Sequence, residues 1–178
     1  MAEKPKLSLT KFLFLLMIVW AVFILIGVAN PETTPLNYTP PESRKGLPEL
    51  SYPLIDGGSW RLSEFKGQPA VINLWATWCP PCHAETPGLV RVARNHSKVQ
   101  FVGVSLDEGN VSAVRAFARD YRIPYPIATG VGAPGMTGQI ALPSTLIIDR
   151  KGRLVTTATG AVDEKSLDHL LDQLEAEP

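Results

Sequence analysis

Two cysteines, the only ones in the 178-residue chain, stand three positions apart in Cys79-Pro80-Pro81-Cys82. The apolar run 70–75 before them predicts a buried strand, and the proline pair is typical of a helix start. Cys79 is therefore expected at a strand-to-helix junction. A thiol there faces free backbone N–H groups and the positive end of the helix dipole, which favour the thiolate that attacks disulfides. Cys82 follows after one helical turn, so the spacing suits a dithiol that opens and closes.

Other sites use the same residue types. With His83 the pair matches C-x-x-C-H, which attaches haem in c-type cytochromes. The two prolines and the buried strand before them favour a dithiol instead, and Met136 and His169, the candidate distal ligands, lie in no supporting motif. A zinc site needs about four ligands, and the spacing of His83, His96 and His169 does not gather them.

Two simpler uses of the cysteine pair also have to be weighed. Cu(I) needs only two thiolates, so a copper carrier remains an alternative. A purely structural disulfide across so short a ring would gain little from loop closure.

The charges argue against nucleic acid as a partner, because seventeen basic and seventeen acidic residues balance and leave no long-range field toward an anionic partner.

An uncharged apolar segment, Phe12 to Ala29, lies near the N-terminus. Its length is just enough to cross a bilayer as a helix, so we expect a transmembrane anchor. The small residues 27–29 also fit a cleaved signal peptide, but the apolar run is longer than usual for one. Three lysines precede it, at positions 4, 6 and 11. By the positive-inside rule the rest of the chain is expected outside the cytoplasm, on the periplasmic or extracellular side.

The chain is accordingly expected to have four parts: a cytoplasmic N-terminus 1–11, the anchor 12–29, a proline-rich extended linker 30–48 and one domain 49–178. Within the domain, apolar spacing and turn residues predict a hairpin over 54–62, a turn capped by Ser63, strands at 70–75, 99–105, 125–128, 144–148 and 154–159, a glycine-rich connection at 130–138, and helices at 80–95, 111–123 and after Asp163. Pro87 should kink the first of these helices. This order predicts an α/β fold, a mixed sheet with helices on both faces.

With these elements in place, several stretches resemble the thioredoxin superfamily. They are Trp75-Ala76-Thr77-Trp78-Cys79-Pro80-Pro81-Cys82, Glu85-Thr86-Pro87, Gly103-Val104-Ser105-Leu106-Asp107 and Leu142-Pro143-Ser144-Thr145 with the apolar run that follows it. The chain is most similar to the membrane-anchored extracytoplasmic branch that includes TlpA, ResA and CcmG (DsbE). The resemblance extends over about 47–175.

The resemblance assigns roles to individual residues. It implies that Cys79 is the nucleophile and Cys82 the resolving thiol, and that Glu85 is a partly buried carboxylate that tunes them. Thioredoxin's buried aspartate, six residues before the first cysteine, is Asn73 here, which leaves Glu85 as the candidate for that task. A glutamate that merely favours the helix dipole is the simpler alternative. The resemblance also implies that a bound polypeptide is contacted by Trp78, Pro80, Leu142 and the cis-proline Pro143.

The function that this resemblance implies is thiol–disulfide exchange on proteins outside the cytoplasm, without cofactor or metal beyond the redox-active pair Cys79–Cys82. It favours reduction of apocytochrome c disulfides, with electrons from a membrane donor similar to CcdA or DsbD. Two prolines between the cysteines do not set the reduction potential, so a protein-disulfide oxidant is the alternative, beside the copper carrier.

Overall fold

The chain divides into two compact units, Met1–Glu32 and Thr33–Pro178. The computed structural model describes residues 9–28, 35–130 and 141–178. Lys4 and Lys6, the first part of the predicted linker, and nearly all of the predicted glycine-rich connection with Met136 lie outside the described residues. In the first unit the helix α1 spans Leu9–Val28. None of the described helices is both long and apolar enough for a membrane span, and the predicted anchor is not confirmed.

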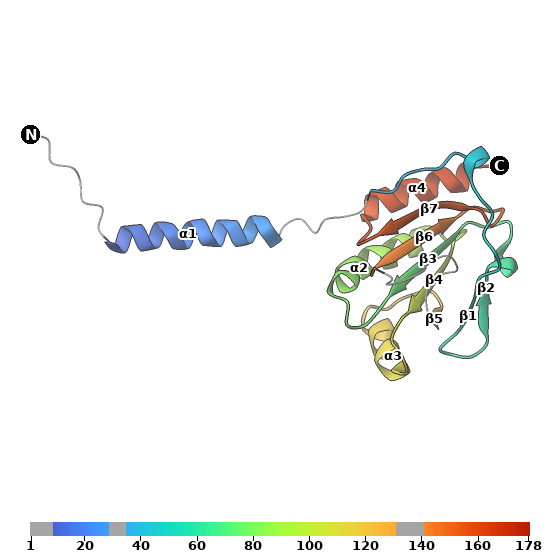
Figure 1. Ribbon diagram of the computed structural model, residues 1–178, viewed down its shortest axis with the longest axis horizontal. Helices are drawn as coiled ribbons and strands as arrows, with labels where there is room; N and C mark the ends of the chain where they lie inside the picture. Colours follow the sequence, from blue (N-terminus) through green and yellow to red (C-terminus); the bar gives the residue numbers. More distant parts are fainter. Residues whose placement is uncertain (1–8, 29–34, 131–140) are drawn as a thin grey trace, which may run out of the picture. The chain divides into compact units, whose positions relative to one another are not determined.

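In its described residues the second unit is built on a five-stranded mixed sheet in the order β5-β4-β3-β6-β7 (Figure 1). The first three of these strands run parallel, whereas β6 is antiparallel to both of its neighbours. All six residues of β3 are buried, as expected for a central strand covered on both sides. The predicted mixed sheet is thus confirmed, and its strands are β3 (Ala70–Trp75), β4 (Gln100–Ser105), β5 (Ile127–Thr129), β6 (Ser144–Ile148) and β7 (Leu154–Thr159).

One face of this sheet is covered by the helices α2 (Pro80–Asn95), α3 (Val111–Asp120) and α4 (Glu164–Ala176). Val71 of β3 packs with Leu89 of α2 and Leu171 of α4 in one buried cluster. Trp75, which points to the same face as Val71, stacks on Phe117 of α3 with ring centroids 4.3 Å apart. The steps β3-α2-β4 and β4-α3-β5 move in one direction across the sheet, and right-handed crossovers then leave both helices on one face.

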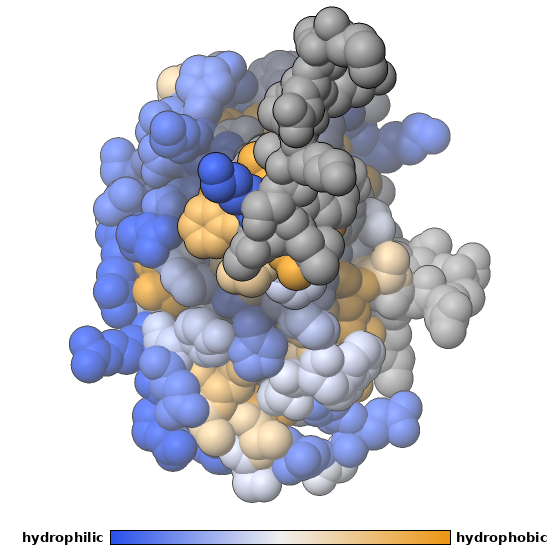
Figure 2. Space-filling view, turned by 90° about the vertical axis from the view of Figure 1, so that its left-hand side faces the viewer, coloured by the Kyte–Doolittle hydropathy of each residue, from blue (hydrophilic) through white to orange (hydrophobic). Residues whose placement is uncertain are grey.

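The opposite face carries a different cover. The antiparallel hairpin of β1 (Ser51–Pro53) and β2 (Ser59–Arg61) and the 3₁₀ helix η2 (Leu62–Phe65) pack against it. Tyr52 and Trp60 lie in one buried cluster with β3 and β4 side chains. The prediction of helices on both faces is therefore corrected for the described residues, because this face is covered by a hairpin and a 3₁₀ helix. In the space-filling view, hydrophilic residues make up most of the visible outer surface (Figure 2).

Two smaller expectations also change. Ser63 does not cap its turn, which has no side-chain cap; the Ser63 hydroxyl donates to Glu49 instead. The described end of the proline-rich segment is not a free linker, since it contains the 3₁₀ helix η1 (Pro41–Ser43) and a buried Arg44. The Arg44 guanidinium binds Asp149 at 3.1 Å and Glu177 at 2.6 Å, so the segment is fastened to the domain at both carboxylates.

The C-terminus of α2 is held by a buried histidine. His96, the C-cap, places its two ring nitrogens 2.7 Å from Glu175 and 3.0 Å from Asp168 of α4. Burial of the ring lowers the pKa of His96, but the hydrogen bonds to the two carboxylates outweigh burial and raise it above its ordinary value. The charged ring also favours the negative end of the helix dipole.

This contact predicts a pH-dependent contribution to stability. Because the folded-state pKa of His96 is raised, its contribution is fully present below the unfolded-state pKa and is lost as pH rises through the folded-state value. We expect His96→Gln to lower the free energy of unfolding by about 1–2 kcal/mol at pH 5.5 and by less at pH 9. Chemical denaturation at both values measures this difference, with His169→Gln on α4 as control. An equal loss at both pH values would contradict the assignment.

Candidate active site

The cysteine pair lies at the N-terminus of α2, as its sequence predicts. Cys79 is the N-cap, the two prolines occupy the first helical positions, and the Cys79 sulfur accepts a hydrogen bond from the backbone N–H of Cys82 at 3.3 Å. The two sulfurs form a disulfide. Cys79 is 3% exposed and Cys82 is 0% exposed. Cys79 is thus the less buried of the two cysteines.

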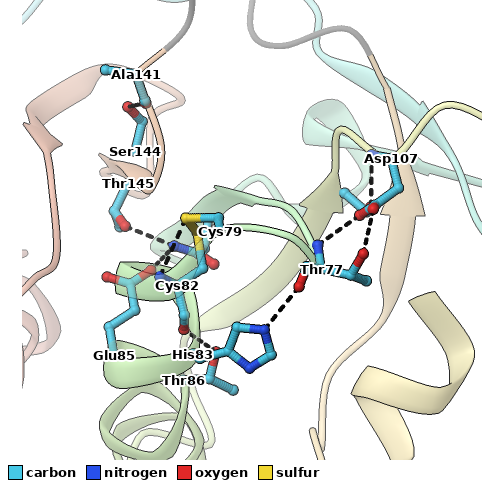
Figure 3. The surroundings of a disulfide bond; sticks show 12 residues. Thr77, Cys79, Cys82, His83, Glu85, Thr86, Asp107, Ala141, Ser144 and Thr145 are labelled. Carbon is cyan, nitrogen blue, oxygen red and sulfur yellow. Dashed lines mark hydrogen bonds between the residues drawn. A yellow bond between two sulfur atoms is a disulfide. The ribbon is translucent and has the colours of Figure 1, made fainter. Parts of the chain in front are cut away.

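The turn that leads into Cys79 is held by Thr77 and Asp107, which stand in the stretches that carry the resemblance but which were given no individual role there. The Cys79 N–H donates to the Ala76 carbonyl at 3.2 Å, which closes a β-turn with Thr77 and Trp78 at its centre. The Thr77 N–H and hydroxyl both donate to the Asp107 carboxylate (Figure 3). Asp107 stands just beyond the end of β4, beside the end of β3, and accepts a further bond from Ser105. The turn is thus anchored to the sheet.

Glu85 is buried behind the pair on α2, at 6% exposure. One carboxylate oxygen accepts from the Asn73 side-chain amide at 2.8 Å, and the other accepts from the Val162 N–H at 3.1 Å. In Figure 3 its carboxyl group points toward Thr145 of β6, whose hydroxyl receives the second N–H of Asn73 at 3.0 Å. Burial raises the pKa of Glu85 to about 7, against the lowering effect of its two hydrogen bonds. The group can therefore gain or lose a proton near neutral pH.

The segment before β6 completes the surroundings of the disulfide. The peptide bond between Leu142 and Pro143 is cis, which is the isomer that the resemblance implies. Leu142 is half-buried and packs against the apolar cluster that contains Cys79 and Cys82. The pairing of Leu74 with Ser144 places Pro143 beside the end of β3, where the chain leaves for the cysteines.

The tryptophans on either side of the turn differ in their surroundings. Trp78 is 67% exposed and stands directly before Cys79, whereas Trp75 is 3% exposed and belongs to the core. The His83 side chain is exposed, and its ring nitrogens lie 2.8 Å from the Thr77 carbonyl and 2.8 Å from the Tyr121 hydroxyl. In the described part of the chain no cluster of three or more His, Cys, Asp or Glu could hold a metal ion.

A helix-capping cysteine joined to a buried one, a sheet of this order, and a cis-proline beside them define a thioredoxin-like thiol–disulfide oxidoreductase. The chain belongs to the AhpC/TSA family, whose model matches residues 44–157.

Relatives of this chain carry names of the same kind. It is 33% identical over 143 residues to the thiol:disulfide interchange protein DsbE of Pseudomonas aeruginosa, covering 75% of this chain and 78% of that one. It is 27% identical over 137 residues to the thiol-disulfide oxidoreductase ResA of Bacillus thuringiensis, covering 75% and 79%. The crystal structure of a DsbF homologue from Corynebacterium diphtheriae shares the fold, with a TM-score of 0.71 at 22% identity over 78% of this chain and 92% of that one.

Proposed function

We propose that the protein reduces disulfides of other proteins outside the cytoplasm, with Cys79 as nucleophile and Cys82 as resolving thiol. The observation that carries this proposal is the asymmetry of the pair, because Cys79 is the less buried of the two cysteines. The backbone N–H of Cys82 and the helix N-terminus face the Cys79 sulfur. Both favour its thiolate over the neutral thiol.

In the proposed reaction the reduced enzyme starts with a thiolate at Cys79. That thiolate attacks one sulfur of the substrate disulfide, and the other substrate sulfur leaves as a thiolate, which takes a proton. Cys82 then loses its proton and attacks the Cys79 sulfur, so the second substrate thiolate leaves. The substrate has gained two electrons and the enzyme ends as the Cys79–Cys82 disulfide, the form in the structure.

Glu85 and the residues around the disulfide serve this reaction in the same proposal. With a pKa of about 7, the Glu85 carboxyl group can take up the proton that Cys82 releases. Trp78 and Pro80, both exposed, contact the substrate polypeptide. The backbone of Leu142 before the cis peptide pairs with the same polypeptide, next to the reacting sulfur.

The proposed location is the outer side of a membrane, with the segment 12–29 as a single-pass anchor. The uncharged sequence of this segment, the lysines before it, and exposures of 46–68% for its large apolar side chains from Leu13 to Trp20 support this. The relatives are named as thiol-disulfide oxidoreductase and thiol:disulfide interchange protein, which supports protein disulfides as substrates. As the family resemblance implies, we further propose apocytochrome c as substrate and a CcdA- or DsbD-type electron donor. Fractionation of a tagged full-length chain tests the location: recovery without detergent in the soluble fraction would contradict an anchor.

The direction of electron flow is tested by the reduction potential of the dithiol. We expect a value below about −200 mV, on the reducing side of protein disulfide isomerase, measured by equilibration with glutathione and thiol labelling. The full-length protein should also reduce insulin disulfides. A potential near −120 mV, that of a strong oxidant, would reverse the direction. Absence of cysteine-dependent turnover together with tight Cu(I) retention would instead support a copper carrier.

A further inference from the structure

The turn before Cys79 contains one residue whose backbone and side-chain polar groups are all bonded. The N–H and hydroxyl of Thr77 go to Asp107, and its carbonyl goes to His83. That carbonyl belongs to the central peptide of the β-turn that Ala76 and Cys79 close. Rotation of this peptide interconverts type I and type II turns and reverses the carbonyl direction. Whatever binds the Thr77 carbonyl therefore selects the conformation of the turn.

His83 binds this carbonyl in a defined tautomer. A carbonyl oxygen only accepts, so the His83 Nε2 atom, 2.8 Å away, must carry a hydrogen. In the neutral imidazole Nδ1 is then an acceptor, and the Tyr121 hydroxyl, 2.8 Å away, donates to it. The ring also packs edge-on against Phe117, with centroids 4.9 Å apart. His83 thus connects α2, the end of α3 and the turn.

We propose that His83 is a positioning residue for disulfide exchange, acting through the Thr77 carbonyl to hold the turn that presents Trp78 and Cys79. Trp78 does not have the positive φ of a type II turn, consistent with the carbonyl direction that His83 selects. None of these bonds involves a sulfur atom. Opening the disulfide therefore breaks none of these bonds directly. This inference deepens the proposed reductase function and rests on it.

Two amide substitutions at His83 distinguish the effect of a hydrogen bond to the Thr77 carbonyl from the effect of any polar side chain at this position. In His83→Gln the amide nitrogen reaches about as far as Nε2 and can still donate to the Thr77 carbonyl, whereas in His83→Asn it reaches only as far as Nδ1. We expect kcat/KM for insulin reduction to fall about fivefold to tenfold in His83→Asn, as for one lost hydrogen bond. His83→Gln should stay within about threefold of wild type. His169→Asn on α4 is the matched control.

Equal activity of wild type and His83→Asn, or an equal loss in both amide variants, would overturn the inference. A second measurement does not depend on turnover. Ring ¹⁵N NMR of the wild type should show the Nε2–H tautomer of His83, and Tyr121→Phe should populate the Nδ1–H form. A wild-type Nδ1–H tautomer would also overturn it. If the wild type lacks cysteine-dependent turnover but shows the Nε2–H tautomer, the proposed reductase function is wrong and His83 has no role in it. The hydrogen bond from His83 to the Thr77 carbonyl would still be supported.

Discussion

A Cys82→Ser variant is expected to accumulate a mixed disulfide between Cys79 and its protein substrate. Cys79 caps the helix and is 3% exposed, against 0% for Cys82, so it still forms the first bond. Residue 82, which is buried and would release the substrate, now carries a hydroxyl group. A neutral hydroxyl group does not attack a disulfide. Turnover of insulin should fall by more than about a hundredfold. Non-reducing electrophoresis and mass spectrometry detect the adduct, which reductant should dissolve.

The matched control is Cys79→Ser. This variant should lose turnover to the same extent and form no adduct, because Cys82 is 0% exposed and no substrate sulfur can reach it. An adduct through Cys82 in this variant would reverse the assigned roles of the two cysteines. Equal adduct formation in both variants would show that the burial of Cys82 does not select the nucleophile.

The elements around the cysteines could be predicted because their signals are local. The buried run of β3 and the proline pair at the first turn of α2 are adjacent in the chain, and both bounds agree with the structure. The cap of α4 is equally local, with Asp163 accepting from the Ser166 N–H three residues later. Apolar spacing and helix capping involve residues within a few positions of one another. They can therefore be recognised in a single sequence.

The contacts that complete the site are not local, and the sequence pattern did not indicate them. Thr77 and Asp107 are thirty residues apart, and Asn73 and Thr145 seventy-two. One signal was available: Asp107 follows β4, and parallel neighbours end at the same edge of a sheet. That rule places Asp107 near the end of β3. Which face of the sheet the hairpin covers also depends on topology. The direction of two successive crossovers places the helices on one face and leaves the other to the hairpin.

A Glu85→Gln variant should remove a pH-dependent penalty on folding. Burial raises the pKa of Glu85 from its ordinary 4.5 to about 7. Between these two values the folded state binds more protons than the unfolded state, so the wild-type free energy of unfolding falls as pH rises. The fall reaches about 3 kcal/mol above pH 7, at about 1.4 kcal/mol per pKa unit. Chemical denaturation of the oxidised protein from pH 4 to pH 9 measures it.

Glutamine can be accommodated in the same network. Its oxygen can accept from the Val162 N–H, and its amide group can donate to Asn73 after the Asn73 amide flips. The Thr145 hydroxyl can then donate to Asn73 instead of accepting. Any remaining difference in hydrogen bonding shifts the stability of the variant equally at all pH values. The difference between Glu85→Gln and wild type should therefore grow from pH 4.5 to pH 7 and then stay constant.

The same substitution tests the proton transfer to Glu85. If the carboxyl group takes the proton of Cys82, the wild-type rate of resolving the mixed disulfide should rise as Glu85 ionises near pH 7, and Glu85→Gln should lose this rise. Glu64→Gln is the control, because the Glu64 side chain is 55% exposed and stays largely in contact with water in the folded protein. A stability difference that is flat with pH would show that burial does not raise the pKa of Glu85. An unchanged pH profile of resolution would assign the proton of Cys82 to another acceptor.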